Sequence, residues 1–286
     1  MKAEREDRLE SNTGQGGFPT RHVLLVLAVL VVGYLLWNAM GEKPAEIEPE
    51  PLVVEEVKVE EPALPPAEDI PPQPAAIVTE AEVVEPAEAP PPLPPLADSD
   101  DLVREQMEAA GLRSTFAPLE EQEDLVQRSA AIIDGFSRGV VLRKLLPIDP
   151  PKAAFSALEE DGTMYMNPAG YSRYDSYSEA ISSLDTSVLV GSFHTLRPLY
   201  EEAYAQLGLD PNDFDNAIIR MLDRVLATPE IDAPIALTRT SVMYKYADPQ
   251  LEQLTPMQKQ LLRMGPDNIR RIKEKASALR EELLNP

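Results

Sequence analysis

The sequence has no cysteine among its 286 residues and only two histidines, His22 and His194. The missing thiols exclude disulfides, thiolate nucleophiles and cysteine-ligated zinc or iron–sulfur sites. The two histidines lie far apart in the chain, so no histidine base is placed near a serine nucleophile by any recognisable motif. The chain also lacks a glycine-rich phosphate-binding motif. We therefore predict no catalytic residue, no metal site and no cofactor.

Basic residues are scarce as well. The chain has 26 lysines and arginines against 49 aspartates and glutamates, which gives a formal net charge of -23. Such an acidic chain repels phosphate backbones, and no basic stripe with interleaved aromatic residues is present. The composition therefore predicts no nucleic-acid partner. The same acidity favours solubility and discourages nonspecific association.

One long uncharged apolar run stands near the N-terminus, at residues 23–40. As a helix it would be about 27 Å long, which matches the hydrocarbon thickness of a bilayer. Tyr34 and Trp37 lie near its end, where aromatic rings favour the headgroup level. A cleavable signal peptide is the alternative, but its apolar core is shorter and ends at a small-residue cleavage site. The run predicts a single uncleaved transmembrane anchor.

Flanking charges predict the orientation of this anchor. Four basic residues precede the run, and two follow it over the next sixty residues: Lys2, Arg5, Arg8 and Arg21, then Lys43 and Lys58. The side richer in lysine and arginine stays in the cytoplasm. We therefore expect a single-pass protein of the bacterial inner membrane, with residues 1–22 as a short cytoplasmic tail and the C-terminal part in the periplasm.

Residues 43–97 have the composition of a linker. They hold 15 of the 29 prolines, mixed with many glutamates. Proline fixes φ and removes amide donors, and like charges repel, so this stretch should be extended and partly polyproline II. We predict a disordered linker that lets the following domain work at a distance from the membrane.

From residue 98 onward, proline becomes less frequent and apolar residues recur with helical spacing. Helices are predicted over about 98–111 and 118–136, after Asp210, after Asp248, after Thr255 and from Pro266 onward. Runs at 154–158 and 163–166 flank an Asp-Gly turn, which indicates a hairpin, and 235–238 offers a third strand. The predicted fold of residues 98–286 is mainly α, a single helical globular domain with a small β-hairpin.

Four segments of this domain together carry a resemblance to a known family. They are residues 143–147, the segment with Tyr171 and Tyr174, residues 241–249, and residues 258–268, which end in Leu-Arg-Met-Gly-Pro-Asp-Asn. Together they resemble the bacterial domain-of-unknown-function family 3014, over roughly residues 98–286. Members of that family look like membrane-anchored proteins with a proline-rich linker. The resemblance implies this architecture, but it implies no activity, ligand or catalytic residue.

Two groups of side chains are candidates for binding. The first is aromatic, with one arginine among its members: Tyr165, Tyr171, Arg173, Tyr174, Tyr244 and Tyr246. Tyrosine offers a flat apolar face and a polar tip, so these residues would suit a groove for a peptide or glycan. The alternative is that they complete the core. The second group, Arg143 and Lys144, could converge on an anion or pair with the many carboxylates.

These observations favour a non-enzymatic binding or scaffold module, tethered to the inner membrane through residues 23–40 and facing an envelope protein or a cell-wall partner. A carboxylate-based enzyme acting on envelope polymer is one alternative, because the domain has many acidic residues that could pair. An energy-transducer-like protein is another, because an anchor and a Glu-Pro linker are typical of that class. The uninterrupted apolar span speaks against a transducer.

Overall fold

The structure, a computed structural model, describes residues 68–72, 92–109, 121–145, 155–239 and 243–285. Within these ranges no helix combines the length and the apolar character needed to cross a membrane. The predicted anchor at 23–40 lies outside them.

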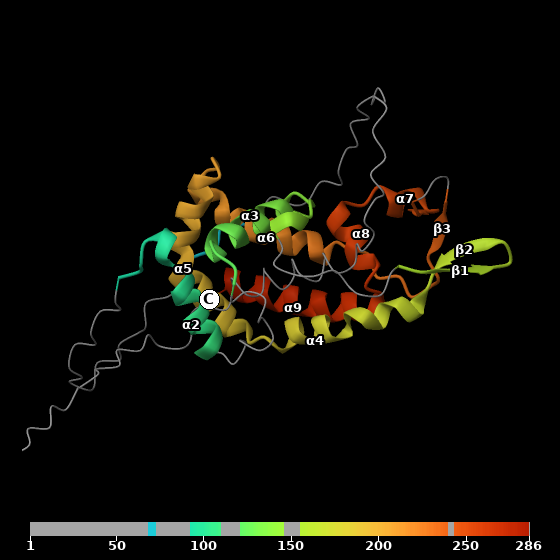
Figure 1. The fold of residues 1–286 in the computed structure, drawn as a ribbon, viewed down its shortest axis with the longest axis horizontal. Coiled ribbons are helices and arrows are strands. Elements are labelled where there is room, and N and C mark those ends of the chain that lie inside the picture. Colours follow the sequence, from blue (N-terminus) through green and yellow to red (C-terminus); the bar gives the residue numbers. More distant parts are fainter. Residues whose placement is uncertain (1–67, 73–91, 110–120, 146–154, 240–242, 286) are drawn as a thin grey trace, which may run out of the picture.

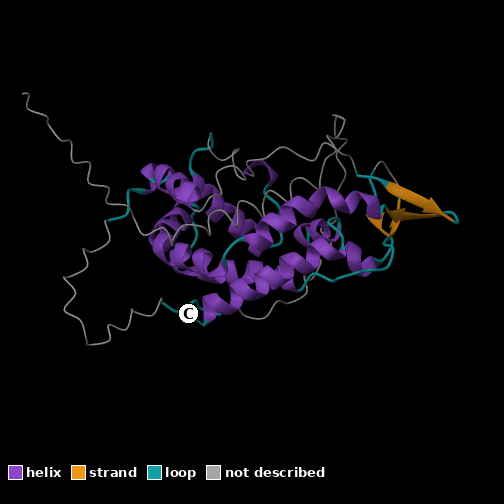
Figure 2. Cartoon of the chain, turned by 90° about the horizontal axis from the view of Figure 1, so that it is seen from below, coloured by secondary structure: helices purple, strands orange, loops and turns teal. Residues whose placement is uncertain are grey.

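The described chain is mainly helical, and a small sheet lies at one end of the elongated helical body (Figures 1 and 2). The α-helices are α2 (Asp100–Ala109), α3 (Leu125–Ser137), α4 (Asp175–Ser183), α5 (Thr186–Gln206), α6 (Phe214–Leu226), α7 (Pro249–Glu252), α8 (Pro256–Leu262) and α9 (Pro266–Leu284). Short 3-10 helices are η1 (Leu96–Asp98), η3 (Arg143–Leu145), η4 (Pro168–Tyr174) and η5 (Pro211–Asp213). The prediction of a mainly α fold is confirmed.

The predicted helix starts after Asp210, Asp248 and Thr255 are confirmed. Each of these side chains accepts a hydrogen bond from a backbone N–H in the turn that follows, which satisfies a donor that has no partner within the helix. At Thr255 the side chain of Gln258 returns the bond to the backbone, which completes a capping box. Local sequence therefore determines where these helices begin.

Helix α3 begins later than predicted, at Leu125 rather than near residue 118. Its first N–H groups are capped from another helix. The carboxylate of Asp100, on α2, accepts hydrogen bonds of 2.8 Å from the backbone N–H groups of Asp124 and Leu125. Because the capping residue is 24 positions away in the sequence, the start of α3 depends on tertiary structure.

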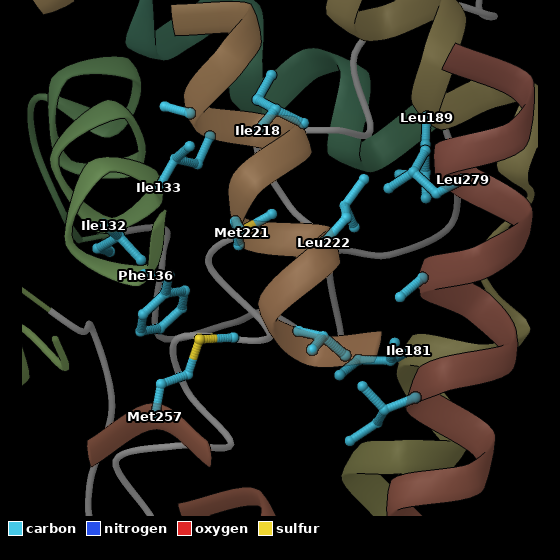
Figure 3. Close-up of a cluster of buried hydrophobic side chains, with 14 of the residues drawn as sticks. Ile132, Ile133, Phe136, Ile181, Leu189, Ile218, Met221, Leu222, Met257 and Leu279 are labelled. Atoms are coloured by element: carbon cyan, nitrogen blue, oxygen red, sulfur yellow. The ribbon is translucent and has the colours of Figure 1, made fainter. Parts of the chain in front are cut away.

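The core is built around α6, which packs against α3 on one side and α9 on the other. Figure 3 shows this arrangement, with apolar side chains of α3, α6 and α9 pointing toward one another. The predicted apolar stripe of the last helix is buried: Ile269, Ile272, Ala276, Leu279 and Leu283. Burial of this face against α6, α4 and α5 holds the bundle together.

The sheet is larger than the predicted hairpin. Strands β1 (Ala157–Glu160), β2 (Thr163–Met166), β3 (Ala236–Thr238) and β4 (Lys245–Tyr246) form an antiparallel sheet in the order β1-β2-β3-β4. The turn between β1 and β2 has positive φ at Asp161 (50°) and Gly162 (76°), as an Asp-Gly hairpin requires. The third strand is confirmed, whereas β4 was not predicted, because two residues are too few to show an alternating pattern.

Part of the predicted linker packs against the domain. Ile70 and Leu96 are each only 3% exposed and belong to the apolar core. Residues 68–72 and 92–97 therefore differ from the prediction of a solvated linker over 43–97. The remainder of that range lies outside the described residues. A single isoleucine among prolines gives no periodic signal, so the sequence did not reveal this contact.

Candidate binding site

Strand β3 and helices α7 and α8 lie toward the end of the body where the sheet lies (Figure 1), and β4, which belongs to one of the segments that carry the family resemblance, pairs with β3 there. Tyr246, in β4, donates a hydrogen bond of 3.0 Å from its hydroxyl to the backbone oxygen of Lys259, in α8. Its backbone N–H donates to Oε2 of Glu252, and Glu252 also forms an ion pair with Lys259. Strand β4 is thus fixed to helices α7 and α8 by polar contacts.

Gly265, between α8 and α9, permits a close contact with Tyr171. Its φ is 85°, a backbone conformation that favours glycine. A Cβ atom at this position would lie closer than 3.0 Å to the Cβ, Cγ and Cδ2 atoms of Tyr171. The tyrosine side chain therefore packs directly on the glycine backbone, and this contact joins η4 to the start of α9.

Asn268 holds η4 and α4 against α9 through a buried polar network. Asn268 is only 1% exposed. The amide donates to the backbone oxygen of Tyr171 (3.2 Å) and to Oδ1 of Asp175 (3.0 Å), while its own oxygen accepts a hydrogen bond from the hydroxyl of Ser178. The side chains of Asp175 and Ser178, one helical turn apart on α4, and the backbone oxygen of Tyr171 thus all bind the same asparagine.

Two neighbouring aromatic rings, with a guanidinium group on either side, lie beside this framework. The guanidinium of Arg239 lies 5.2 Å from the ring centroid of Tyr244, and the ring of Tyr244 lies 5.6 Å from that of Phe155. The guanidinium of Arg263 lies 5.9 Å from the ring of Phe155. We call these four residues the aromatic–arginine ladder. Arg239 is exposed, whereas Phe155, Tyr244 and Arg263 are partly buried, and both rings pack against the apolar core.

A further guanidinium, that of Arg143, lies beside the ladder. Partial burial lowers the pKa of Arg143, and the positive charge of Arg263 lowers it further. Arg263 makes no ion pair with a carboxylate in the described part of the chain. A guanidinium such as that of Arg263, which has no carboxylate partner among these residues, is chemically suited to bind a carboxylate or a phosphate.

The tyrosines behind the ladder remain protonated at neutral pH. Burial raises the pKa of Tyr174 to about 12, although the neighbouring Arg173 and Arg263 oppose this shift. Burial also raises the pKa of Tyr246 to about 12 and that of Tyr171 above its usual value. Among the described residues, the buried hydroxyl of Tyr174 has no hydrogen-bond partner. These rings act as neutral, largely structural supports.

The structure brings together most of the residues predicted to bind. Tyr171, Arg173 and Tyr174 lie in η4, and Tyr174 and Tyr246 are mainly buried behind the ladder. Arg173 stacks over Tyr174 at 4.8 Å. Tyr244 belongs to the ladder itself. Tyr174 and Tyr246 complete the core, and Tyr244 is partly buried against it. That these tyrosines line a groove for a ligand stays a prediction.

Tyr165 does not join them. Side chains alternate across a strand, and Tyr165 pairs with Leu158 and Ala236, whereas Met164 pairs with Leu237, which in turn pairs with Tyr246. Tyr165 therefore lies on the opposite face of the sheet from Tyr246. A one-residue offset along a strand was enough to misplace it in the prediction.

Of the remaining residues, Lys144 was predicted as a site residue, whereas Phe155 and Arg263 were not. Lys144 is exposed in η3 next to Arg143 and adds a positive charge at the surface. The signal that pointed to Arg263 was its place in the Leu-Arg-Met-Gly segment of the family resemblance, whereas Phe155 carried no signal of its own.

No group of three or more potential metal ligands exists among the residues that the structure describes. One carboxyl group is unusual. Burial raises the pKa of Asp215 to about 6, despite its ion pair with Arg197. Arg197 also pairs with Glu201 at 3.2 Å. A general acid must direct an oxygen at its substrate, but Asp215 is 4% exposed and bound to arginine. The buried carboxylate of Asp215 is therefore held within the fold by Arg197.

Comparison with known proteins gives a family. Residues 125–280 match the model of a family described as "Protein of unknown function (DUF3014)". The chain belongs to this family. The match begins at the first residue of α3 and ends near the end of α9, so the DUF3014 region includes the helical bundle, the sheet and the ladder. Searches among curated proteins and among solved structures gave no match.

Proposed function

We propose that this DUF3014 protein is a membrane-tethered envelope protein whose folded domain binds a partner without catalysing a reaction. Residues 23–40 form the anchor in the bacterial inner membrane, the N-terminus is cytoplasmic, and the domain is periplasmic. The partner is an envelope protein or a cell-wall polymer that presents an anionic group beside a flat apolar face.

The observation that carries the proposal is the position of Arg263. Its guanidinium lies 5.9 Å from the ring centroid of Phe155, its positive charge lowers the pKa of Arg143, and it has no carboxylate partner within the described ranges. The chain as a whole has a large excess of acidic residues. A cation that stays apart from so many carboxylates is suited to a group supplied by another molecule.

The ladder also provides apolar contact. The exposed parts of Phe155 and Tyr244 offer flat faces on which a sugar ring or an apolar side chain can stack. Tyrosine and arginine are the residue types that contribute most to binding at protein interfaces. The Tyr171–Gly265 contact and the Asn268 network hold the supporting elements in place, so little ordering is required when a partner binds.

The membrane topology can be tested with single cysteines, because the natural chain has none. A membrane-impermeant maleimide should label Glu60→Cys in intact cells whose outer membrane is permeabilised, and should label Ser11→Cys only after lysis. The reverse pattern would contradict the proposed orientation. Equal labelling of both positions in a soluble fraction would contradict the anchor.

Binding can be tested by in-cell crosslinking with a photoreactive amino acid in place of Tyr244. Mass spectrometry should identify one reproducible adduct. Tyr165 provides the matched control, since it is the same residue type but lies on the face of the sheet opposite to Tyr246, and Tyr244 directly precedes the strand of Tyr246. An adduct at position 244 and none at 165 supports the proposal. Equal adducts at both positions, or none at either in a folded domain, would contradict it.

A further inference from the structure

A short piece of the proline-rich region lies on the helical domain far from the ladder. It consists of residues 68–72, Glu-Asp-Ile-Pro-Pro. Ile70 is 3% exposed and belongs to the core cluster, whereas Glu68, Asp69 and Pro72 remain exposed. One apolar side chain is thus inserted while the residues around it stay in solvent. This pattern is typical of a short linear segment bound to a surface.

An ion-pair chain fixes the charged end of this segment. The guanidinium of Arg280, on α9, donates a hydrogen bond of 2.8 Å to Oε1 of Glu68. Through its Nε, Arg280 also donates to Oδ1 of Asp223, on α6, at 2.7 Å. Arg280 therefore binds Glu68, the acidic residue of the segment, and Asp223 holds the guanidinium of Arg280 in position.

The sequence of the segment lowers the entropy lost when it binds. Ile70 precedes Pro71, and a residue before proline is restricted to extended conformations. Two successive prolines restrict the chain further. A segment that is already extended loses less conformational freedom on binding than an ordinary loop does.

We propose that the surface formed by Arg280 and Asp223 is a recognition site for the acidic-isoleucine-proline segment 68–72 of the same chain. Binding is reversible, so the domain has two tether lengths. With the segment bound, the tether ends at Glu68, 28 positions after Met40; with it released, the tether ends at Pro92, 52 positions after Met40. At about 3.1 Å per residue, the maximal reach changes from roughly 90 Å to roughly 160 Å.

The location of the site also sets the orientation of the domain. Arg280 lies 14 residues after Pro266 on α9, about 21 Å along the helix axis. Figure 1 shows that the C-terminal end of α9 lies away from the sheet. A tether bound there leaves the ladder facing away from the anchor. This consequence rests on the proposed anchor and binding surface, whereas binding of the segment itself does not.

The test is a distance measurement between two spin labels in the full chain in detergent micelles. Labels are attached to Ala67→Cys and Ser277→Cys, which place one label beside the segment and one on the exposed side of α9. Double electron–electron resonance should give a narrow distribution of short distances. Ile70→Ser should convert it to a broad distribution of longer distances, and Glu68→Gln should increase the broad fraction.

Two control variants show whether the effect is specific to Ile70 and Glu68. Ile77→Ser changes the same residue type nearby in the same proline-rich region and should leave the narrow distribution intact, as should Arg270→Gln, another arginine of α9. A broad distribution in the unmodified sequence would overturn the proposal, as would a narrow one in Ile70→Ser. Short distances between singly labelled chains would show binding by a second copy and would also overturn it. So would a loss of thermal stability in Ile70→Ser as large as in Ile218→Ala, because the segment would then belong to the cooperative core.

Discussion

Replacing Gly265 by alanine tests the contact on which the binding site is built. Gly265 has φ 85° and ψ 162°, a region of backbone space that is almost restricted to glycine, and a side chain there costs about 2 kcal/mol. The new Cβ would also overlap the side chain of Tyr171, and forced repacking of this kind costs about 2 kcal/mol more. The free energy of unfolding should therefore fall by about 4 kcal/mol.

Substitutions at two other glycines separate the cost of the backbone conformation from the cost of the overlap with Tyr171. Gly208 also has positive φ, 79°, but an added Cβ would meet no atom within 4 Å. Gly170 has neither constraint. Gly208→Ala should cost about 1 kcal/mol, and Gly170→Ala should be neutral or slightly stabilising. Chemical denaturation followed by far-UV circular dichroism is the appropriate assay, because it reports helix content directly and the only tryptophan of the sequence, Trp37, is outside the described residues.

A double-mutant cycle identifies the overlapping partner. In a Tyr171→Ala background the clash is absent, so Gly265→Ala should cost only the backbone component, about 2 kcal/mol. The reasoning is refuted if Gly265→Ala costs no more than Gly208→Ala. It is also refuted if the cost of Gly265→Ala is the same with and without the tyrosine side chain.

Three further predictions concern buried polar groups. Because burial raises the pKa of Asp215 to about 6, the folded state binds this proton more tightly, so stability should fall as the pH rises from about 4 to 6, by up to about 3 kcal/mol. Asp215→Asn should remove this part of the pH dependence in denaturation curves. Asn268→Ala should cost about 3 kcal/mol, whereas Asn285→Ala, at the exposed end of α9, should cost less than about 0.5 kcal/mol in the same assay. Tyr246→Phe should cost about 1 kcal/mol by thermal denaturation, since its hydroxyl donates to a backbone oxygen.

The balance of energies at the 68–72 site is consistent with reversible binding. Burial of Ile70 contributes roughly 2 kcal/mol, and the Glu68–Arg280 pair, whose acid is largely exposed, contributes less than about 1 kcal/mol. Closing the chain between Pro72 and Pro92 costs about 3 kcal/mol. Because these terms nearly cancel, small changes in sequence or salt should shift the bound fraction measurably.

The helices were predictable where the signal is local. Capping side chains at Asp210, Asp248 and Thr255 determine helix starts, and the apolar stripe of α9 follows directly from its spacing. The start of α3 was not predictable, because its cap comes from Asp100 on another helix. Strand β4 was missed for a related reason: its two residues are fixed by pairing with β3 rather than by their own pattern.

In the site, too, the features set by local sequence were predictable and those set by tertiary contacts were not. The tyrosines and Arg173 were predicted as one candidate group and Arg143 with Lys144 as a second; η4 holds Tyr171, Arg173 and Tyr174, and Arg143 interacts with Arg263 near Phe155. Phe155 could not be chosen from sequence, because its role depends on contacts with Tyr244 and Arg263, which are distant in the chain. Tyr165 was misplaced because strand register decides which face a side chain occupies. The inserted Ile70 was hidden because one apolar residue in a proline-rich stretch forms no pattern.

Crosslinking at position 244 in Arg263 variants tests the central claim most directly. With a photoreactive residue in place of Tyr244, the natural arginine should give a specific adduct in cells, and Arg263→Gln should reduce its yield at least about tenfold, as loss of a charge-assisted contact predicts. Arg270→Gln, in which the arginine removed lies on α9 and pairs with Asp232 and Asp267, should leave the yield unchanged. An adduct that persists at full yield in Arg263→Gln would contradict recognition of an anionic partner by the ladder.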